Sequence, residues 1–220
     1  MSSLHHPKSA TLAAFAAGAL DEARGVVVAT HLEFCEACRR AARDFEALGG
    51  LCLETIEPAA LSDDAVQRFW MRAGASSTQP SPASTRAAND RELSDARPLS
   101  AYLKGGIEAV QWKPVAPGMA QSVLDASGYR PGVLRLLKIA PGVRLPKHTH
   151  RGAELTLLLE GAYEDELGQF ARGDLVDLDH EATHSPRAIG DGPCICLIAT
   201  SGPLAFKTFL GKAIQPFIGL

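Results

Sequence analysis

The distribution of apolar residues divides the chain into two parts with different periodicities. Up to about residue 73, large apolar residues recur three or four positions apart, as expected for one face of a helix. After about residue 98, they form short runs separated by glycine and proline, which is typical of β-strands joined by turns. The pattern predicts an all-α N-terminal part followed by an all-β C-terminal part.

The N-terminal part is expected to contain four helices. Leu12 and Phe15 share one face of an alanine-rich segment, and Asp21 can cap the segment that follows it. A third helix should start near Glu36 and end at the pair Gly49 and Gly50, since glycine commonly follows a helix C-terminus. The expected helices span about residues 9–20, 22–31, 36–50 and 62–72.

The last of these helices carries a clear apolar face. Ser62 is a suitable N-cap, and the acidic residues that follow it offset the helix dipole in the first turn. Val66, Phe69 and Trp70 share one face of the helix. Because apolar side chains are usually buried, we expect this face to pack against its own domain.

The segment between the two parts has the composition of a linker. Residues 74–98 are rich in Ala, Ser, Thr and Pro and contain hardly any large apolar residue that could anchor them. We therefore expect a helical domain at 1–73, a linker at 74–98 and a β domain at 99–220. Within the β domain, strand-like runs at 133–140, 155–159, 175–178 and 195–200 predict a barrel or sandwich.

Charge and cysteine usage exclude several classes of protein. Residues 1–73 carry ten acidic and seven basic residues, so this part offers no basic surface to nucleic acid. The N-terminus does not resemble a secretion signal, and no run approaches the roughly 18 apolar residues of a membrane span. We expect a cytoplasmic protein without direct nucleic-acid or membrane contacts. In that compartment its five cysteines are expected to bind metal or to remain free thiols.

A compact metal-binding motif lies at the junction of the second and third expected helices. His31, Cys35 and Cys38 give the spacing His-x3-Cys-x2-Cys, and zinc favours such tetrahedral nitrogen and sulfur ligands. A thioredoxin-like redox pair would need a βαβ pattern, which is absent here. Three residues are candidates for the fourth ligand: His6, its neighbour His5, and Cys52. We prefer His6, and Cys52 is also suited to packing as a small apolar residue.

A second cluster of metal ligands lies in the β domain and resembles the first cupin motif. The motif reads Gly142-x5-His148-x-His150-x3-Glu154-x6-Gly161. His148 and His150 are two apart on a strand and should face the same side, where Glu154 can join them.

The second cupin motif is degenerate, because Asp179 and Glu181 stand where cupins usually have Pro and Gly. Gly173 and His184 keep its spacing, so His184 is expected to be the fourth ligand, whereas His180 is expected to be a solvated loop residue. On the following strand, Cys194 and Cys196 should share one face, with packing as the default role and a redox or metal-exchange role as the alternative.

Together the two motifs resemble the ChrR-type anti-sigma factors, in which a zinc-binding anti-sigma domain precedes a cupin-like domain. The run at 161–170, GAYEDELGQF, is also similar to that family's cupin. The resemblance implies a regulatory protein that binds an extracytoplasmic-function sigma factor and releases it under oxidative stress such as singlet oxygen. It also implies two zinc ions, one held by His6, His31, Cys35 and Cys38 and the other by His148, His150, Glu154 and His184.

Two other functions fit the residues alone. Three imidazoles and one carboxylate also support dioxygenases or isomerases when the metal is iron or manganese, so a cupin metalloenzyme with a helical zinc module is the main alternative. The second alternative is a structural zinc module fused to a small-molecule-binding barrel, without contact to a sigma factor. Metal identity distinguishes the enzyme, and a sigma-factor pull-down distinguishes the binding module.

Overall fold

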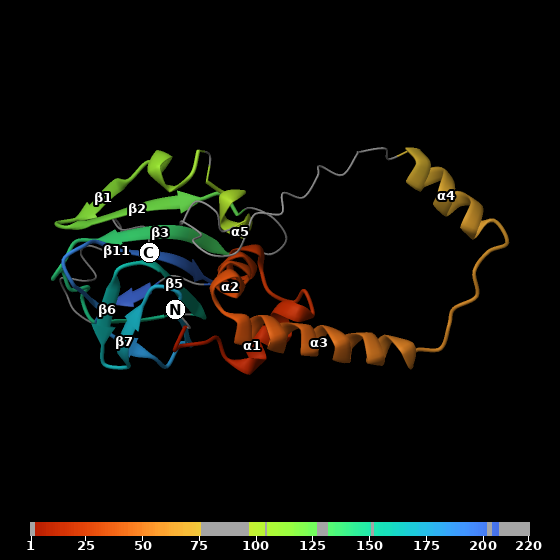
Figure 1. The fold of residues 1–220 in the computed structure, drawn as a ribbon, viewed down its shortest axis with the longest axis horizontal. Coiled ribbons are helices and arrows are strands. Elements are labelled where there is room, and N and C mark those ends of the chain that lie inside the picture. The colour runs from red at the N-terminus through yellow and green to blue at the C-terminus, as the bar shows by residue number, and fades with distance from the viewer. Residues whose placement is uncertain are drawn as a thin grey trace.

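The computed structural model describes residues 3–75, 97–103, 105–126, 132–150, 152–201 and 204–206. Its N-terminal part is helical and its C-terminal part consists of β-sheets, as the sequence pattern predicts (Figure 1). Among the described residues, none of the helices combines the length and the apolar composition that a membrane span requires. The helices are α1 (Ser9–Ala16), α2 (Glu22–Phe34), α3 (Glu36–Glu54), α4 (Ala65–Ala75), α5 (Arg97–Ser100) and a 3₁₀ turn at Ile107–Ala109.

The expected cap of α2 is present, but other helix boundaries differ from the prediction. The Asp21 side chain accepts a hydrogen bond from the Arg24 N–H at 2.9 Å. α1 ends earlier than expected, just before Gly18, which has a φ of 64°. α3 continues through Gly49 and Gly50, so the predicted stop was wrong. Neither glycine has a positive φ, and a glycine inside a helix costs only about 1 kcal/mol relative to alanine.

The prediction that the apolar face of α4 is buried was also wrong. α4 lies at the far end of an arm that leaves the rest of the molecule along α3 (Figure 1). It begins three residues after Ser62, and the Ser62 hydroxyl accepts a hydrogen bond from Arg68 at 2.7 Å. The aromatic pair Phe69 and Trp70 is more than half exposed.

The C-terminal part contains three antiparallel sheets. The largest has the strand order β1-β2-β3-β11-β5-β8, and the smaller ones have the orders β10-β6-β7 and β12-β4-β9. The four predicted runs correspond to β3, β5, β8 and β11, each within one residue of the expected bounds. The strands are β1 (Lys113–Ala116), β2 (Met119–Leu124), β3 (Val133–Ile139), β4 (His148–His150), β5 (Glu154–Glu160), β6 (Ala162–Asp165), β7 (Gly168–Ala171), β8 (Leu175–Leu178), β9 (Thr183–His184), β10 (Arg187–Ile189), β11 (Cys194–Thr200) and β12 (Leu204–Phe206).

The two faces of the six-stranded sheet belong to different apolar clusters. Leu134 and Leu136 of β3 pack in a cluster that also contains Val27 and Val28 of α2. Leu137, on the same strand, belongs to the second cluster, together with side chains from β5, β7 and β11. Alternation along the strand therefore places the helices on one face of the sheet and a separate interior on the other. One candidate metal centre lies on each side.

Candidate metal centres

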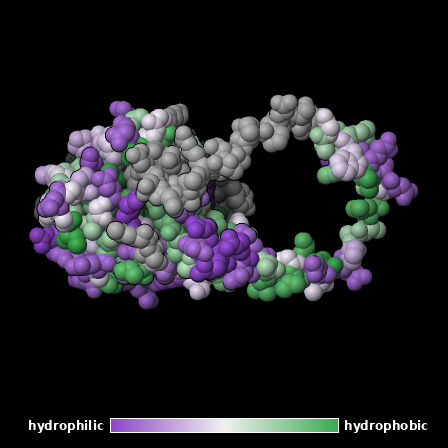
Figure 2. Space-filling model, in the orientation of Figure 1, coloured by the Kyte–Doolittle hydropathy of each residue, from purple (hydrophilic) through white to green (hydrophobic). Residues whose placement is uncertain are grey.

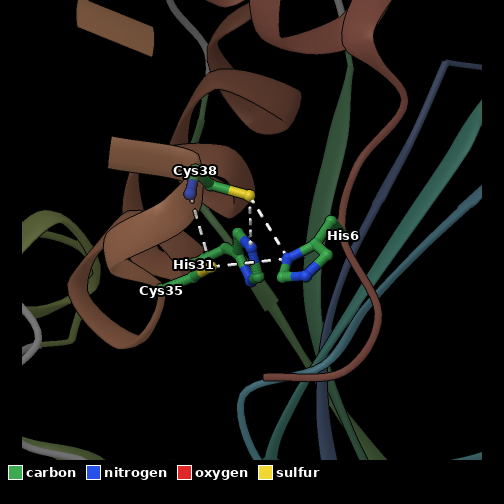
Figure 3. Close-up of side chains that lie close together, drawn as sticks. All are labelled: His6, His31, Cys35 and Cys38. Carbon is green, nitrogen blue, oxygen red and sulfur yellow. Dashed lines mark hydrogen bonds between the residues drawn. The ribbon is translucent and has the colours of Figure 1, made fainter. Parts of the chain in front are cut away.

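Two histidines and two cysteines meet where the N-terminal segment crosses the junction of α2 and α3 (Figure 3). One ligand atom from each of His6, His31, Cys35 and Cys38 lies within 4.8 Å of all the others. The Cys38 Sγ lies 3.3 Å from His31 Nε2 and 3.4 Å from His6 Nδ1, and the Cys35 Sγ lies 3.4 Å from His6 Nδ1. Zinc bond lengths in a tetrahedral site imply nitrogen–sulfur edges of about 3.5 Å, so the cluster has the right size for the ion.

The local fold explains how the two sulfurs converge. Cys35 is the last residue before α3 and leaves the helical conformation, with φ −118° and ψ 105°. Its sulfur accepts a hydrogen bond from the Cys38 N–H at 3.4 Å, so Cys35 acts as the N-cap of α3. Both sulfurs thus lie at a helix N-terminus, where the helix dipole favours the negative thiolate.

Burial favours the neutral form of both kinds of side chain in this cluster, the imidazole and the thiol. Burial lowers the pKa of His31 to about 4, so its imidazole is neutral at pH 7, which is the form that binds metals. Burial, together with the neighbouring Cys35 thiol, raises the pKa of Cys38 to about 12. A thiolate there needs a nearby cation, and a divalent metal supplies that charge. The cluster can therefore bind a metal ion.

Hydrogen bonds from the sheet region orient the histidine ligands. The His31 Nδ1–H donates to the Gly173 carbonyl at 2.9 Å, which keeps the lone pair on Nε2, the atom that faces Cys38. Asp174 accepts hydrogen bonds from the backbone N–H groups of Leu4 and His5, immediately before His6. Burial raises the pKa of the Asp174 carboxyl, but the hydrogen bonds from Ala171, His5 and Leu4 outweigh it, so the net pKa lies below its usual value.

The two rival ligands lie outside this cluster. His5 Nδ1 lies 3.2 Å from Asp174 Oδ2, and the His5 ring packs against Phe170 with centroids 4.5 Å apart. Cys52 is exposed on α3. Of the three residues weighed for the fourth position, His6 is therefore the one that the structure brings to His31 and the two thiols.

A second group of ligand-type side chains borders a cavity in the sheet region. His148, Glu154 and His184 all line this cavity, and all three are buried. His148 of β4 pairs with His184 of β9 across the strands, with ring centroids 4.5 Å apart. His150 lies two residues further along β4, but its side chain is outside the described part of the structure.

A polar contact at Nδ1 fixes the ring orientation of both described histidines of this group, His148 and His184. The His148 Nδ1–H donates to the Pro146 carbonyl at 2.8 Å, and His184 Nδ1 lies 2.9 Å from Asp165 Oδ2. The Asp165 side chain has no exposed surface. Both contacts keep the imidazole lone pair on Nε2, as in metal sites with an outer-shell acceptor. Asp165 was not among the expected site residues, and its signals in the sequence are its place in the acidic run 164–166 and in the cupin-like run 161–170.

Comparisons with known proteins decide the family. Residues 104–205 match the family described as the ChrR cupin-like domain. Anti-sigma-E factor ChrR of Cereibacter sphaeroides is 41% identical over 213 residues, which are 97% of this chain and 97% of that protein. The crystal structure of Rhodobacter sphaeroides SigE in complex with the anti-sigma ChrR matches with a TM-score of 0.76 and 36% identity, over 91% of this chain and 100% of the matched chain.

The chain belongs to the ChrR family of anti-sigma factors. Anti-sigma factors are regulatory binding proteins, so membership of the ChrR family places the chain in that class rather than among the cupin metalloenzymes. The residues that match the ChrR cupin-like domain include His148, Glu154 and His184 of the cavity. The match to Anti-sigma-E factor ChrR also includes the cluster around His31.

The remaining cysteines of this ChrR-family chain share one face of β11, as expected from their spacing. Cys194 and Cys196 have sulfurs 3.6 Å apart and both are buried. Cys196 also lines the cavity, beside Tyr163. The hydrogen bond with Cys194, together with burial, raises the pKa of the Cys196 thiol well above its usual value. The Cys196 side chain therefore borders the cavity, and neither cysteine lies on the outer surface. His180, in contrast, is exposed.

Proposed function

We propose that this protein is a cytoplasmic, zinc-dependent anti-sigma factor that sequesters an extracytoplasmic-function sigma factor. Residues 1–73 form its zinc-binding anti-sigma domain, 74–98 its linker and 99–220 its cupin barrel. The sigma factor is released under oxidative stress, such as singlet oxygen, that the barrel senses. The proposal rests on the ChrR family and, above all, on the exposed apolar surface described next.

The observation that carries this function is the apolar arm, defined here as residues 48–75. Nine of the thirteen exposed large apolar side chains of the described residues lie in this arm, and Figure 2 shows apolar residues along it. Phe69 and Trp70, 61% and 66% exposed, form an edge-to-face pair with ring centroids 5.1 Å apart. An exposed apolar surface of this extent marks a protein-binding site.

A sigma factor is the partner that best fits the arm. The matched ChrR crystal structure is a complex with SigE, and it covers 91% of this chain. The arm also carries Asp63 and Asp64 at the start of α4, which would repel the phosphates of nucleic acid. An apolar surface with acidic borders therefore supports a protein partner.

Zinc is the metal that best fits both centres. Two imidazoles and two thiolates in a tetrahedral arrangement are a typical structural zinc set. In the barrel, we assign His148, His150, Glu154 and His184 to a second zinc, by analogy with the cupin motif. The helical part is small, so its zinc contributes directly to its stability, on the order of several kcal/mol.

The barrel is the more suitable sensor of the two parts. Its interior combines the histidine and glutamate side chains with a thiol, Cys196, on the wall of one cavity. An oxidant that enters the cavity would meet both kinds of group, whereas the partner-binding arm carries only the exposed thiol of Cys52. Signal detection and sigma binding would then occupy different ends of the molecule.

Replacing both Phe69 and Trp70 by serine tests the assigned surface. We expect the affinity for the purified sigma factor, measured by isothermal titration calorimetry, to fall at least about 100-fold, because central aromatic side chains dominate such interfaces. Leu167→Ser is the matched control, since Leu167 is 53% exposed but lies in the β6–β7 turn. Wild-type affinity in the double variant would show that the arm is not the binding surface.

A further inference from the structure

The turn between β7 and β8 contacts both histidine-bearing segments of the helical metal centre. Asp174 in this turn is buried, with Oδ1 accepting from the Leu4 N–H at 2.8 Å, the His5 N–H at 3.1 Å and the Ser3 hydroxyl at 3.2 Å. The Leu175 N–H donates to the His5 carbonyl at 3.1 Å. His5, immediately before His6, thus has both its backbone N–H and its backbone C=O hydrogen-bonded to this turn.

The same turn holds His31 from the opposite direction. The Gly173 carbonyl accepts from His31 Nδ1 at 2.9 Å, and the conformation that aims this carbonyl has a φ of 92°, which favours glycine. The Gly173 N–H donates to the Leu158 carbonyl at 2.8 Å, and the Leu158 N–H donates to the backbone carbonyl of Asp174 at 3.0 Å. The turn is therefore fixed to β5, the strand that begins with Glu154.

We propose that the 171–175 turn of the cupin-like part forms the outer shell of the helical metal centre. In this turn, Asp174 positions His6 and the Gly173 carbonyl positions His31. The inference rests on the metal site of the proposed function. The thiols are positioned by α3 alone, so the two parts of the chain each orient half of the ligand set. The cupin-like part thereby sets how tightly the helical part holds its metal.

Asp174 matters because it accepts the hydrogen bonds of the residues just before His6, whereas the backbone after His6 is held separately, through the Lys8 N–H, by Asp177. His6 is exposed, so burial does not fix its ring, and it lies in a segment without secondary structure before α1. An asparagine at this position keeps one uncharged acceptor oxygen but places an NH2 group where the second carboxylate oxygen meets the Ala171 N–H and the His5 ring. The segment is then held less firmly, which allows His6 to leave the cluster. Removing an outer-shell partner typically weakens metal binding by about 10- to 100-fold.

The test is cobalt binding to the full chain, since the sulfur-to-cobalt charge-transfer band reports thiolate ligation. In competition with a chelator, Asp174→Asn should bind cobalt about 10- to 100-fold more weakly at the thiolate site than the wild type does. Asp179→Asn is the control, because it removes the same charge from an exposed pair with Lys8, and its affinity should be unchanged. An Asp174→Asn protein with wild-type affinity and an unchanged band would overturn the inference.

The outcomes separate this inference from the function on which it rests. A wild-type protein without a charge-transfer band would contradict the helical metal site itself. If Asp174→Asn does not fold, as judged by near-ultraviolet circular dichroism, the combined change Ser3→Ala and His5→Ala removes side-chain contacts to Asp174 from a terminal segment instead. That variant should also bind cobalt more weakly, and wild-type affinity in it would refute the role of the turn.

Discussion

Replacing Cys38 by alanine is expected to remove one of two zinc ions and to abolish sigma binding. Cys38 contacts both His6 and His31 in the cluster, so its loss leaves three ligands and opens the site. Structural zinc contributes directly to the stability of a small helical part, on the order of several kcal/mol, and the loss of one ligand removes most of this contribution. Elemental analysis should give about two zinc ions per wild-type chain and one per variant chain.

The matched control is Cys52→Ala, which removes a thiol from the same helix. Cys52 is exposed and outside the cluster, so the zinc content should equal that of the wild type. A Cys38→Ala protein that still binds the sigma factor would refute a structural role for the zinc. A wild-type protein with a single metal, or with iron in the barrel, would contradict the two-zinc assignment.

The variants His148→Ala and His184→Ala are expected to leave sigma binding intact but to prevent release by oxidant. Both residues line the cavity on the face of the sheet opposite to α2, so their loss should empty or weaken the proposed site in the cupin-like part without changing the cluster around His31. A ligand or oxidant can shift the sigma-bound state only through groups with which it interacts. A sigma-dependent reporter exposed to singlet oxygen measures this release, and we expect induction to fall to the uninduced level.

His180→Ala is the control, because His180 is an exposed histidine three residues before β9. Its reporter should respond as the wild type does. Normal induction in the His148→Ala and His184→Ala strains would show that the barrel is not the sensor. Point variants are preferable to deletion of the barrel, because Val27 and Val28 are fully buried in a cluster with residues of the sheet and would be exposed by the deletion.

Features that depend on neighbours in the sequence were predictable. The four main strands followed from short apolar runs between turn residues, and the Asp21 cap followed from its position before α2. The closeness of His31, Cys35 and Cys38 followed in the same way, because the three residues span a single helix junction. In each case the local backbone determines the geometry, so a spacing rule is sufficient.

Features that depend on distant contacts or on a partner were not predictable. Burial of the α4 face was expected because apolar faces are usually buried. A single sequence does not reveal whether such a face packs against its own core or against another protein. The hydrogen bonds of Asp174 to Leu4 and His5 join residues about 170 positions apart, and no motif marks them. The packing of α2 on the sheet was hidden for the same reason, since the polar segment 74–98 suggested two independent units.

The most direct test of the central claim is an in vitro transcription assay with the extracytoplasmic-function sigma factor, core RNA polymerase and the zinc-loaded protein. If the protein sequesters the sigma factor, adding it before the polymerase should abolish transcription from the sigma factor's promoter at about one protein per sigma molecule. Transcription by the housekeeping sigma factor should continue. Undiminished transcription at a several-fold excess of the zinc-loaded protein would contradict the account.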